Sequence, residues 1–463
     1  MFVTQPAPFI EAYVEELDEA LGKLSPGKGL TRIQKKWLGL CLLGILITNT
    51  VCWAKIERAS LGRYSRAALS WMFRQASIPW EWLLVASIKV VLRGHHITQG
   101  IVVVDDSEKR RAKSTKRIYQ AHKMKDKKTG GYINGQSLLV LLVVTPQVTI
   151  PVGIAFYQPD PALSAWYQEE KKQKKEGVPK KERPPKPEKN EVYPDKQVIA
   201  LRLMTEFKSH LPRLKIKAVL ADALYGTEDF IDQASALFGD IQVISQLRSN
   251  QLVRDQNQKV NLEEYFAQRP AKTQTLTIRG QHKVVTWAAA RLYVFAHHKK
   301  RLIVAVKYEG ETDYRYLVAS DLSWRAEDVL EIYGLRWLVE VFLQDWKSYE
   351  GWGQLTKHPD QDGSCRSLTL SLLLDHCLLF HPEQLARLKN KLPLATLGSL
   401  QEKIKAENLF LFIQDLLKDD VEQNLERLSQ AIAQSFPLSP SEKHMSQHKI
   451  VYFYSGFSDL GHT

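Results

Sequence analysis

The spacing of hydrophobic residues changes several times along the chain, and each change marks a region with its own expected secondary structure. Helical spacing, with apolar residues every three or four positions, alternates with short continuous apolar runs that are typical of buried strands. A third stretch, rich in aromatic and β-branched residues between polar turns, predicts an all-β insertion. The predicted regions are helical residues 1–98, a mixed core at 99–247, the β-rich insertion at 248–322, a helical return to the core at 323–357 and a helical region at 358–463.

The core region contains the strands of a mixed sheet. Apolar runs at residues 101–104, 138–144 and 150–157 are joined by short connections and predict an antiparallel meander. A helical segment at 196–211 follows, and residues 216–221 supply another strand. We therefore expect an α/β fold in which helices flank a mixed sheet, an all-β insertion interrupts the core, and both terminal regions are helical.

The apolar segment at residues 37–53 has the composition of a membrane span but is short for that role. It includes Gly39 and Gly44 and ends near the polar run Thr48-Asn49-Thr50. We therefore expect a buried core helix here, and no membrane among the partners of this protein.

Residues 165–195 differ from the rest of the core because Lys, Glu and Pro dominate them. Such a segment has too few apolar side chains to order itself by burial. We expect a flexible, charged loop at the surface.

The formal net charge of +13 and the pI near 9.3 favour a polyanionic partner, with nucleic acid ahead of an anionic membrane surface. The four cysteines form no CxxC pair, and no set of His and Cys has the spacing of zinc ligands. Free thiols and an N-terminus without a signal-peptide pattern indicate a cytoplasmic location.

The helical residues 1–98 are interpreted as a DNA-binding region. Thr31 is placed to cap a helix, and a turn near Leu61-Gly62 separates two further helical segments. The basic residues Arg63, Arg66 and Arg74 on these segments suit a bihelical DNA-binding unit. A helical packing domain with basic residues facing solvent explains the same pattern equally well.

Residues 328–350 predict a helix with two different faces. At about 100° per residue, four polar residues fall within an arc of about 60°: Tyr333, Arg336, Glu340 and Lys347. The opposite side carries a broad apolar stripe of Leu335, Leu338, Phe342 and Trp346. The polar face is either a solvated surface with an Arg336–Glu340 pair worth a few tenths of a kcal/mol or part of a catalytic site.

Three acidic residues favour the catalytic interpretation. Asp105 and Asp222 each end a hydrophobic strand, and parallel pairing of these strands would place them side by side. A helix packed on the sheet would aim Glu340 at the same point. Three carboxylates repel one another unless a cation joins them, and Mg²⁺ prefers such oxygen ligands. Two ions would stabilise the attacking and leaving oxygens of a phosphoryl displacement.

A basic stretch follows Asp105 directly and is predicted to bind phosphates beside the metals. Its candidate DNA-binding residues are Lys109, Arg110, Arg111, Lys113, Lys116 and Arg117.

The spacing Tyr333-x₂-Arg336-x₃-Glu340-x₆-Lys347 resembles the YREK signature of the insertion-sequence-four family of bacterial DDE transposases. Asp105-Asp106-Ser107 resembles the first acidic motif of that family, and the ADALYG segment with Asp222 resembles its second. The resemblance implies a ribonuclease-H-like core interrupted by a β domain. It also implies cut-and-paste transposition, often through hairpin-ended DNA.

By this resemblance, Asp105, Asp222 and Glu340 are catalytic residues that hold two Mg²⁺ ions, for which Mn²⁺ can substitute. Tyr333, Arg336 and Lys347 would contact phosphates near the transposon end. The implied partners are the terminal repeats, target DNA and a second copy of the chain bound on DNA. Two alternatives stay open: a DNA-binding descendant that no longer cuts, and a nuclease of the same fold without strand transfer.

The doublet Asp105-Asp106 leaves the first metal ligand open. The pattern Asp-x-Ser selects Asp105, and a shift by one residue selects Asp106. Because successive strand residues point to opposite faces, we expect only one of the two, Asp105, to face the metals.

Overall fold

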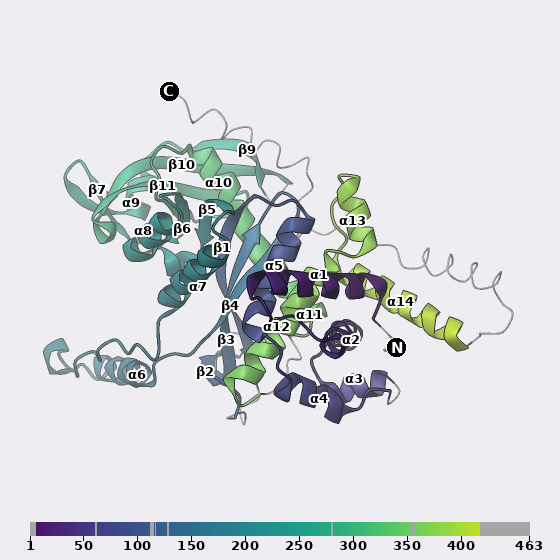
Figure 1. The fold of residues 1–463 in the computed structure, drawn as a ribbon. Coiled ribbons are helices and arrows are strands. Elements are labelled where there is room, and N and C mark those ends of the chain that lie inside the picture. Colours follow the sequence, from purple (N-terminus) through teal and green to yellow (C-terminus); the bar gives the residue numbers. More distant parts are fainter. Residues whose placement is uncertain are drawn as a thin grey trace.

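The computed structural model describes residues 6–60, 63–111, 115, 117–126, 129–278, 281–352 and 358–416. Within these residues a single sheet of twelve strands runs through the molecule, with the strand order β2-β3-β1-β5-β6-β12-β11-β10-β7-β8. Strand β4 pairs with β3, and β9 pairs with β10, beside this path. Helices cover both faces of the sheet (Figure 1).

The N-terminal region is helical, as predicted. Its helices are α1 Pro8–Leu24, α2 Arg32–Thr48, α3 Trp53–Ala59, α4 Arg66–Gln75 and α5 Trp80–Gly94. The side chain of Thr31 caps α2 in a capping box with Gln34, which satisfies backbone N–H groups that the first turn leaves open. The turn predicted at Leu61-Gly62 lies outside the described residues.

Helix α2 is buried over most of its length, so the prediction of a core helix in this segment is confirmed. The helix ends at Thr48, before the predicted end at residue 53, because Asn49 adopts a left-handed backbone conformation with φ 49°. Within the described part of the chain, no single helix has the length and apolar character to cross a membrane. Helices α2 and α3 pass that test only as a pair, with a bend of 86° between them.

Five strands form the ribonuclease-H-like half of the sheet, in the order β4-β3-β1-β5-β6. Strands β1, β3 and β4 are antiparallel neighbours, so the predicted meander is confirmed, and β1, β5 and β6 run parallel. Helices α7 and α8 contribute to the hydrophobic cluster on one face, and α11 contributes to the cluster on the other. The bounds are β1 Gln99–Arg110, β2 His122–Lys125, β3 Tyr132–Val144, β4 Thr149–Tyr157, β5 Lys215–Ala221, β6 Gln242–Leu247, α7 Lys196–His210 and α8 Glu228–Leu237.

The predicted β-rich insertion continues the core sheet instead of forming a sheet of its own. Strand β12 pairs antiparallel with β6, with Tyr316 opposite Leu247, and the other inserted strands extend outward from β12. The elements are β7 Leu252–Asp255, β8 Gln258–Asn261, α9 Leu262–Ala267, β9 Lys272–Ile278, β10 Gln281–Val294, β11 Lys299–Tyr308 and β12 Arg315–Ala319.

The helix predicted at 328–350 is interrupted. Helix α10 Ala326–Tyr333 is followed by a 3₁₀ turn, Gly334–Arg336, and then by α11 Trp337–Tyr349. Backbone angles stay helical through this turn, so the polar and apolar faces persist across it. The single-helix prediction is wrong only in this break.

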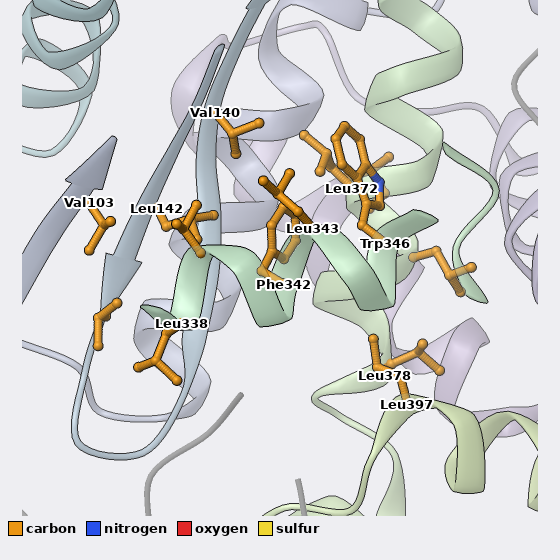
Figure 2. Close-up of a cluster of buried hydrophobic side chains, with 14 of the residues drawn as sticks. Val103, Val140, Leu142, Leu338, Phe342, Leu343, Trp346, Leu372, Leu378 and Leu397 are labelled. Carbon is orange, nitrogen blue, oxygen red and sulfur yellow. The ribbon is translucent and has the colours of Figure 1, made fainter. Parts of the chain in front are cut away.

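The apolar face of α11 packs between the sheet and the C-terminal helices, as Figure 2 shows. Leu338, Phe342 and Trp346 are buried against Val103 and Leu142 of the strands and against leucines of the C-terminal helices. Full burial of each such side chain contributes about 1.5–3 kcal/mol. The C-terminal helices are α12 Gln361–Leu378, α13 Pro382–Lys389 and α14 Leu397–Leu416.

The flexible loop predicted at 165–195 contains a helix. Helix α6 Pro161–Lys175 begins with Asp160 as a side-chain cap and Pro161 in its first turn, and none of its residues is buried. A cap, an N-terminal Pro and a run of good helix formers stabilise the helix locally, without a core. The prediction was right about exposure and wrong about the lack of structure.

Helix α8 is joined to β11 by the carboxylate of Asp232. Lys299 Nζ lies 2.5 Å and Arg301 Nη2 2.6 Å from this carboxylate. Burial opposes the charge of Asp232, but hydrogen bonds from both cations outweigh it and lower the pKa of Asp232. The two ion pairs of Asp232 therefore connect the inserted strands to the core. Because the Asp232 carboxylate titrates, this connection depends on pH.

We predict that Asp232→Asn lowers the free energy of unfolding by about 1–2 kcal/mol at pH 7, less than for a fully buried pair, because 34% of the Asp232 side chain is exposed. Because the folded-state pKa lies below the unfolded one of about 3.9, this stabilisation is complete above that pH and disappears as the pH falls through the folded-state pKa. Urea unfolding across pH 2.5–7 (roughly the range of carboxyl titration) measures it. The matched control, Asp328→Asn, removes a local pair with the exposed Arg325 three residues earlier and should cost less than about 0.5 kcal/mol. A difference for Asp232→Asn that does not change with pH contradicts the prediction.

Candidate active site

Parallel pairing of β1 with β5 ends at Val104 and Ala221, and the predicted acidic residues follow at that point. Asp222 begins the turn after β5, whereas β1 continues through Asp105 and Asp106 paired only with β3. The three aspartates each offer a carboxylate oxygen, and these oxygens all lie within 4.8 Å of one another. This group of Asp105, Asp106 and Asp222 is called the carboxylate cluster below.

Both residues of the doublet place a carboxylate oxygen in the carboxylate cluster, so the argument that strand alternation keeps one of them away from this point is wrong. Which of the two binds metal stays a prediction. Along β1, Val103 belongs to the hydrophobic cluster under α11 and Val104 to the cluster under α7, so Asp105 and Asp106 start toward opposite faces. Asp222 lies beyond the end of β5, at an edge that both faces share. Because β5 no longer pairs with β1 beyond Val104, the side chains of Asp105 and Asp106 both have room to turn toward Asp222.

Asp105 lies in a partly buried environment with two hydrogen bonds. Its Oδ1 accepts the N–H of Asp106 at 2.8 Å, and its Oδ2 accepts Nη1 of Arg336 at 2.6 Å. Burial raises the pKa of Asp105 to about 6, with Asp222 and Asp106 adding to the rise and Arg336 opposing it. The charged form of this carboxylate therefore gains from any further cation.

Asp222 is held by the turn that it begins. Its Oδ1 accepts the N–H of Leu224 at 2.9 Å, and its backbone carbonyl accepts the Ser245 hydroxyl at 2.6 Å. Burial raises the pKa of Asp222, and the nearby charge of Asp106 raises it further.

Glu340 lies at the rim of the site and is outside the carboxylate cluster. Its Oε1 is 2.9 Å from Nη2 of Arg336, and 54% of its side chain is exposed. The Arg336 guanidinium thus contacts both Asp105 and Glu340. The structure brings Asp105 and Asp222 together, and links Glu340 to them through this arginine. Its predicted role as a metal ligand stays a prediction.

Two residues near the cluster were missed by the sequence analysis. Lys196, the first residue of α7, places its Nζ 2.6 Å from Oδ2 of Asp106. Tyr225 is fully buried, and its hydroxyl has no hydrogen-bond partner among the described residues. Burial and then the charges of Asp106 and Asp222 raise the pKa of Tyr225. The only sequence signal for them was their position beside predicted element ends.

Tyr333 and Lys347, the other two residues of the predicted polar helix face, take different positions. Tyr333 donates its hydroxyl to the backbone carbonyl of Ala221 at 3.2 Å, which fixes the end of α10 to the end of β5. Residues 326–349, which comprise α10, the 3₁₀ turn and α11, are called the signature helix below. Lys347 lines a surface pocket with Glu340 and Gln344. Burial lowers the pKa of Lys109, as do the charges of Arg111 and Lys347, so these cations lie close together.

The basic stretch after Asp105 is only partly available for phosphates. Arg110 contacts the buried carboxylate of Asp126 at 2.5 Å, and Arg111 donates to Gln136 at 2.8 Å. Arg117 is exposed, and Lys113 and Lys116 lie outside the described residues. Arg110 and Arg111 therefore support the fold, whatever else they contact.

The carboxylate cluster fits a hard divalent cation. All donors are carboxylate oxygens, which Mg²⁺ prefers, and their spacing allows them to share one ion. The raised pKa values of Asp105 and Asp222 show that burial disfavours their charges, a cost that a bound cation offsets.

Comparison with known proteins agrees with this chemistry. The sequence profile of one protein family, described as DDE superfamily endonuclease, matches residues 35–304, more than half of the chain. The chain belongs to this family. The matched part of the chain contains Asp105 and Asp222, whereas Glu340 follows it.

Among solved structures, the chain is similar to the Drosophila P element transposase strand transfer complex, with 9% sequence identity and a TM-score of 0.23 over 96% of this chain and 93% of that one. No curated protein matches the sequence. Membership of the DDE endonuclease family rests on the match to residues 35–304, and membership of the insertion-sequence-four family stays a prediction.

Gly226 closes the turn that holds Asp222, and we predict that Gly226→Ala destabilises the protein by about 1–3 kcal/mol. A Cβ at this position would lie 2.1 Å from the backbone carbonyl oxygen of Gln246. The matched control is Gly22→Ala in α1, where a Cβ meets no atom within 4 Å and helix propensity adds about 0.5–1 kcal/mol of stability. Urea unfolding of both variants measures the difference. Equal stability of the two variants contradicts the proposed close approach.

Proposed function

We propose that the protein is a DNA transposase that binds the ends of an insertion sequence and catalyses DNA cleavage and strand transfer with divalent metal ions. The observation that carries the proposal is the carboxylate cluster at the point where the parallel pairing of β1 with β5 ends, in a chain of the DDE endonuclease family. Phosphoryl transfer needs little covalent help from the protein, and positioned charges supply most of the catalysis.

Asp105 and Asp222 are the proposed principal metal ligands, and Glu340 is the proposed third. Two bound Mg²⁺ ions would lower the pKa of the attacking water or 3′-hydroxyl and would stabilise charge on the leaving oxygen. In the DNA-free protein Arg336 forms ion pairs with both Asp105 and Glu340. We propose that Arg336 pairs with a DNA phosphate when DNA binds, which leaves both carboxylates free to bind metal.

The proposed path of the DNA backbone follows the side of the site that α11 covers. Lys347, Lys109 and Arg336 place positive charge on both sides of Glu340 along β1 and the signature helix. Phosphate contacts of this kind position the duplex and carry no sequence information by themselves. End recognition is assigned to the helical N-terminal region, with the exposed residues Arg63 and Arg66 as candidates.

The insertion-sequence-four resemblance supports further detail: a homodimer assembled on the terminal repeats, and excision through hairpin ends. A nuclease of the same fold would use the same carboxylates. It would cut end DNA but would join no strands, so a strand-transfer assay separates the two activities.

We predict that Asp105→Asn, Asp222→Asn and Glu340→Gln each lower Mg²⁺-dependent cleavage of an end duplex at least about 100-fold, since each removes a proposed metal ligand. Asp106→Asn should cost less than about 10-fold, because Lys196 already pairs with this carboxylate. The substrate is labelled DNA from the flanks of the coding region. Asp328→Asn, which removes a carboxylate of α10 that pairs with Arg325 outside the carboxylate cluster, is the control and should cut normally. Undiminished cutting by Asp105→Asn or Asp222→Asn would refute the catalytic assignment.

We also predict that Lys347→Ala and Arg336→Ala weaken binding to the end duplex and reduce its salt dependence. Each lost phosphate contact lowers the slope of log K against log salt by about 0.9. Titrations of labelled duplex at several salt concentrations measure this slope. Lys389→Ala, an exposed lysine of α13, is the control with the same change of charge. If both site variants keep the unmutated slope, their phosphate role is wrong.

A further inference from the structure

Residues 158–195, called the arm below, leave the body of the protein as an ordered projection (Figure 1). Helix α6 runs outward, and the chain that returns is tied to it: Trp166 Nε1 donates to the Pro184 carbonyl at 2.8 Å, and Arg183 lies 3.6 Å from the Glu170 carboxylate. Among the described residues, the hydrogen bonds and ion pairs of residues 161–192 all stay inside the arm. The arm is thus built to keep its shape while it contributes nothing to the core.

Positive charge is concentrated at the outer end of the arm. Residues 171–181, the arm tip, contain six lysines and one glutamate, a formal net charge of +5. All six are exposed, and none is in an ion pair of the described residues. They are Lys171, Lys172, Lys174, Lys175, Lys180 and Lys181. Six like charges within so short a segment repel one another, and a polyanion relieves this repulsion.

The rest of the arm is not basic, which separates the tip from an ordinary solvated charge run. Outside residues 171–181, the arm carries more Asp and Glu than Lys and Arg. Glu170 is used to hold Arg183, and Trp166 to hold the returning chain, so these side chains serve the shape of the arm. The lysines at the tip have no such role.

The base of the arm lies at the carboxylate cluster. The arm begins after β4 ends at Tyr157 and returns into α7 at Lys196, whose Nζ pairs with Asp106. The 15 residues of α6 extend about 22 Å at 1.5 Å per residue. DNA rises about 3.4 Å per base pair, so this length corresponds to about six base pairs of duplex.

We propose that the arm is a DNA-backbone-binding element, whose lysines contact phosphates about six base pairs from the position of cleavage. The ligand chemistry is duplex phosphate read without base sequence, because lysine ammonium groups act as point charges on flexible stems. The distance rests on the proposed function of the carboxylate cluster, and the affinity for DNA rests on the arm tip alone. The arm therefore increases the hold on DNA that flanks the site, whatever its sequence.

The test uses the full-length protein and the variant K171Q/K172Q/K174Q/K175Q. Two duplexes from the flanks of the coding region serve as probes, one extending about 20 base pairs to each side of the cleavage position and one extending about 4. On the long duplex we expect at least a 10-fold weaker affinity at about 150 mM salt and a salt slope smaller by about 2–4. On the short duplex we expect the variant and the unmutated protein to bind equally.

The matched control K171R/K172R/K174R/K175R keeps the charge and should bind the long duplex like the unmutated protein. An unchanged affinity and slope of the glutamine variant on the long duplex overturns the proposal. So does loss of self-association in sedimentation with an unchanged salt slope, because the arm would then bind a second copy of the chain. Cleavage is read separately: if the unmutated protein does not cut, the proposed function fails, while the binding difference still decides whether the arm holds DNA.

Discussion

The parallel pairing of β1 with β5 is the constraint on which the site depends. The two strands stay in register up to Val104 and Ala221, and both are buried between hydrophobic clusters on the two faces of the sheet. Where β5 ends, β1 continues with one neighbour fewer, and acidic residues occupy both strands at this point. The apolar runs thus supply the stability, and their unequal lengths supply the opening in which carboxylates from both faces meet.

The charges at this opening are balanced by two cations from opposite sides. Arg336 approaches from the signature helix and contacts Asp105 and Glu340, while Lys196 approaches from α7 and contacts Asp106. Burial raises the pKa of Asp105, and Arg336 only partly offsets this rise, so further positive charge would stabilise the ionised carboxylate. In the proposed function, a DNA phosphate would pair with the Arg336 guanidinium, and a metal ion held by the carboxylates would supply the positive charge that they need.

Much of this could be predicted from the sequence, because the relevant signals are local. The continuous apolar run before Asp105 predicts a buried strand, and the same logic places Asp222 beside it. The stripe of Leu338, Phe342 and Trp346 predicts which face of the signature helix is buried.

The features that the sequence could not predict depend on where helices and strands end and on which elements pack against one another. Asp106 joins the carboxylate cluster only because β5 ends where it does, and the partner of Asp106, Lys196, lies at the start of a helix far along the chain. The break at Gly334 and the pairing of β12 with β6 are likewise tertiary outcomes. The arm was wrongly predicted to be flexible, because order was expected only where apolar side chains are buried. In α6 a side-chain cap and high helix propensity stabilise the helix without burial.

We propose that the carboxylates of Asp105 in β1 and Asp222 directly after β5 hold the catalytic metal. A structure of the protein with end DNA and saturating Mn²⁺, with the metal located by its anomalous scattering, tests this most directly. We predict a peak within about 2.1 Å of carboxylate oxygens of both Asp105 and Asp222, with Arg336 turned away from Asp105 and toward a DNA phosphate. No peak between these two side chains, with Arg336 still paired to Asp105, would contradict the claim.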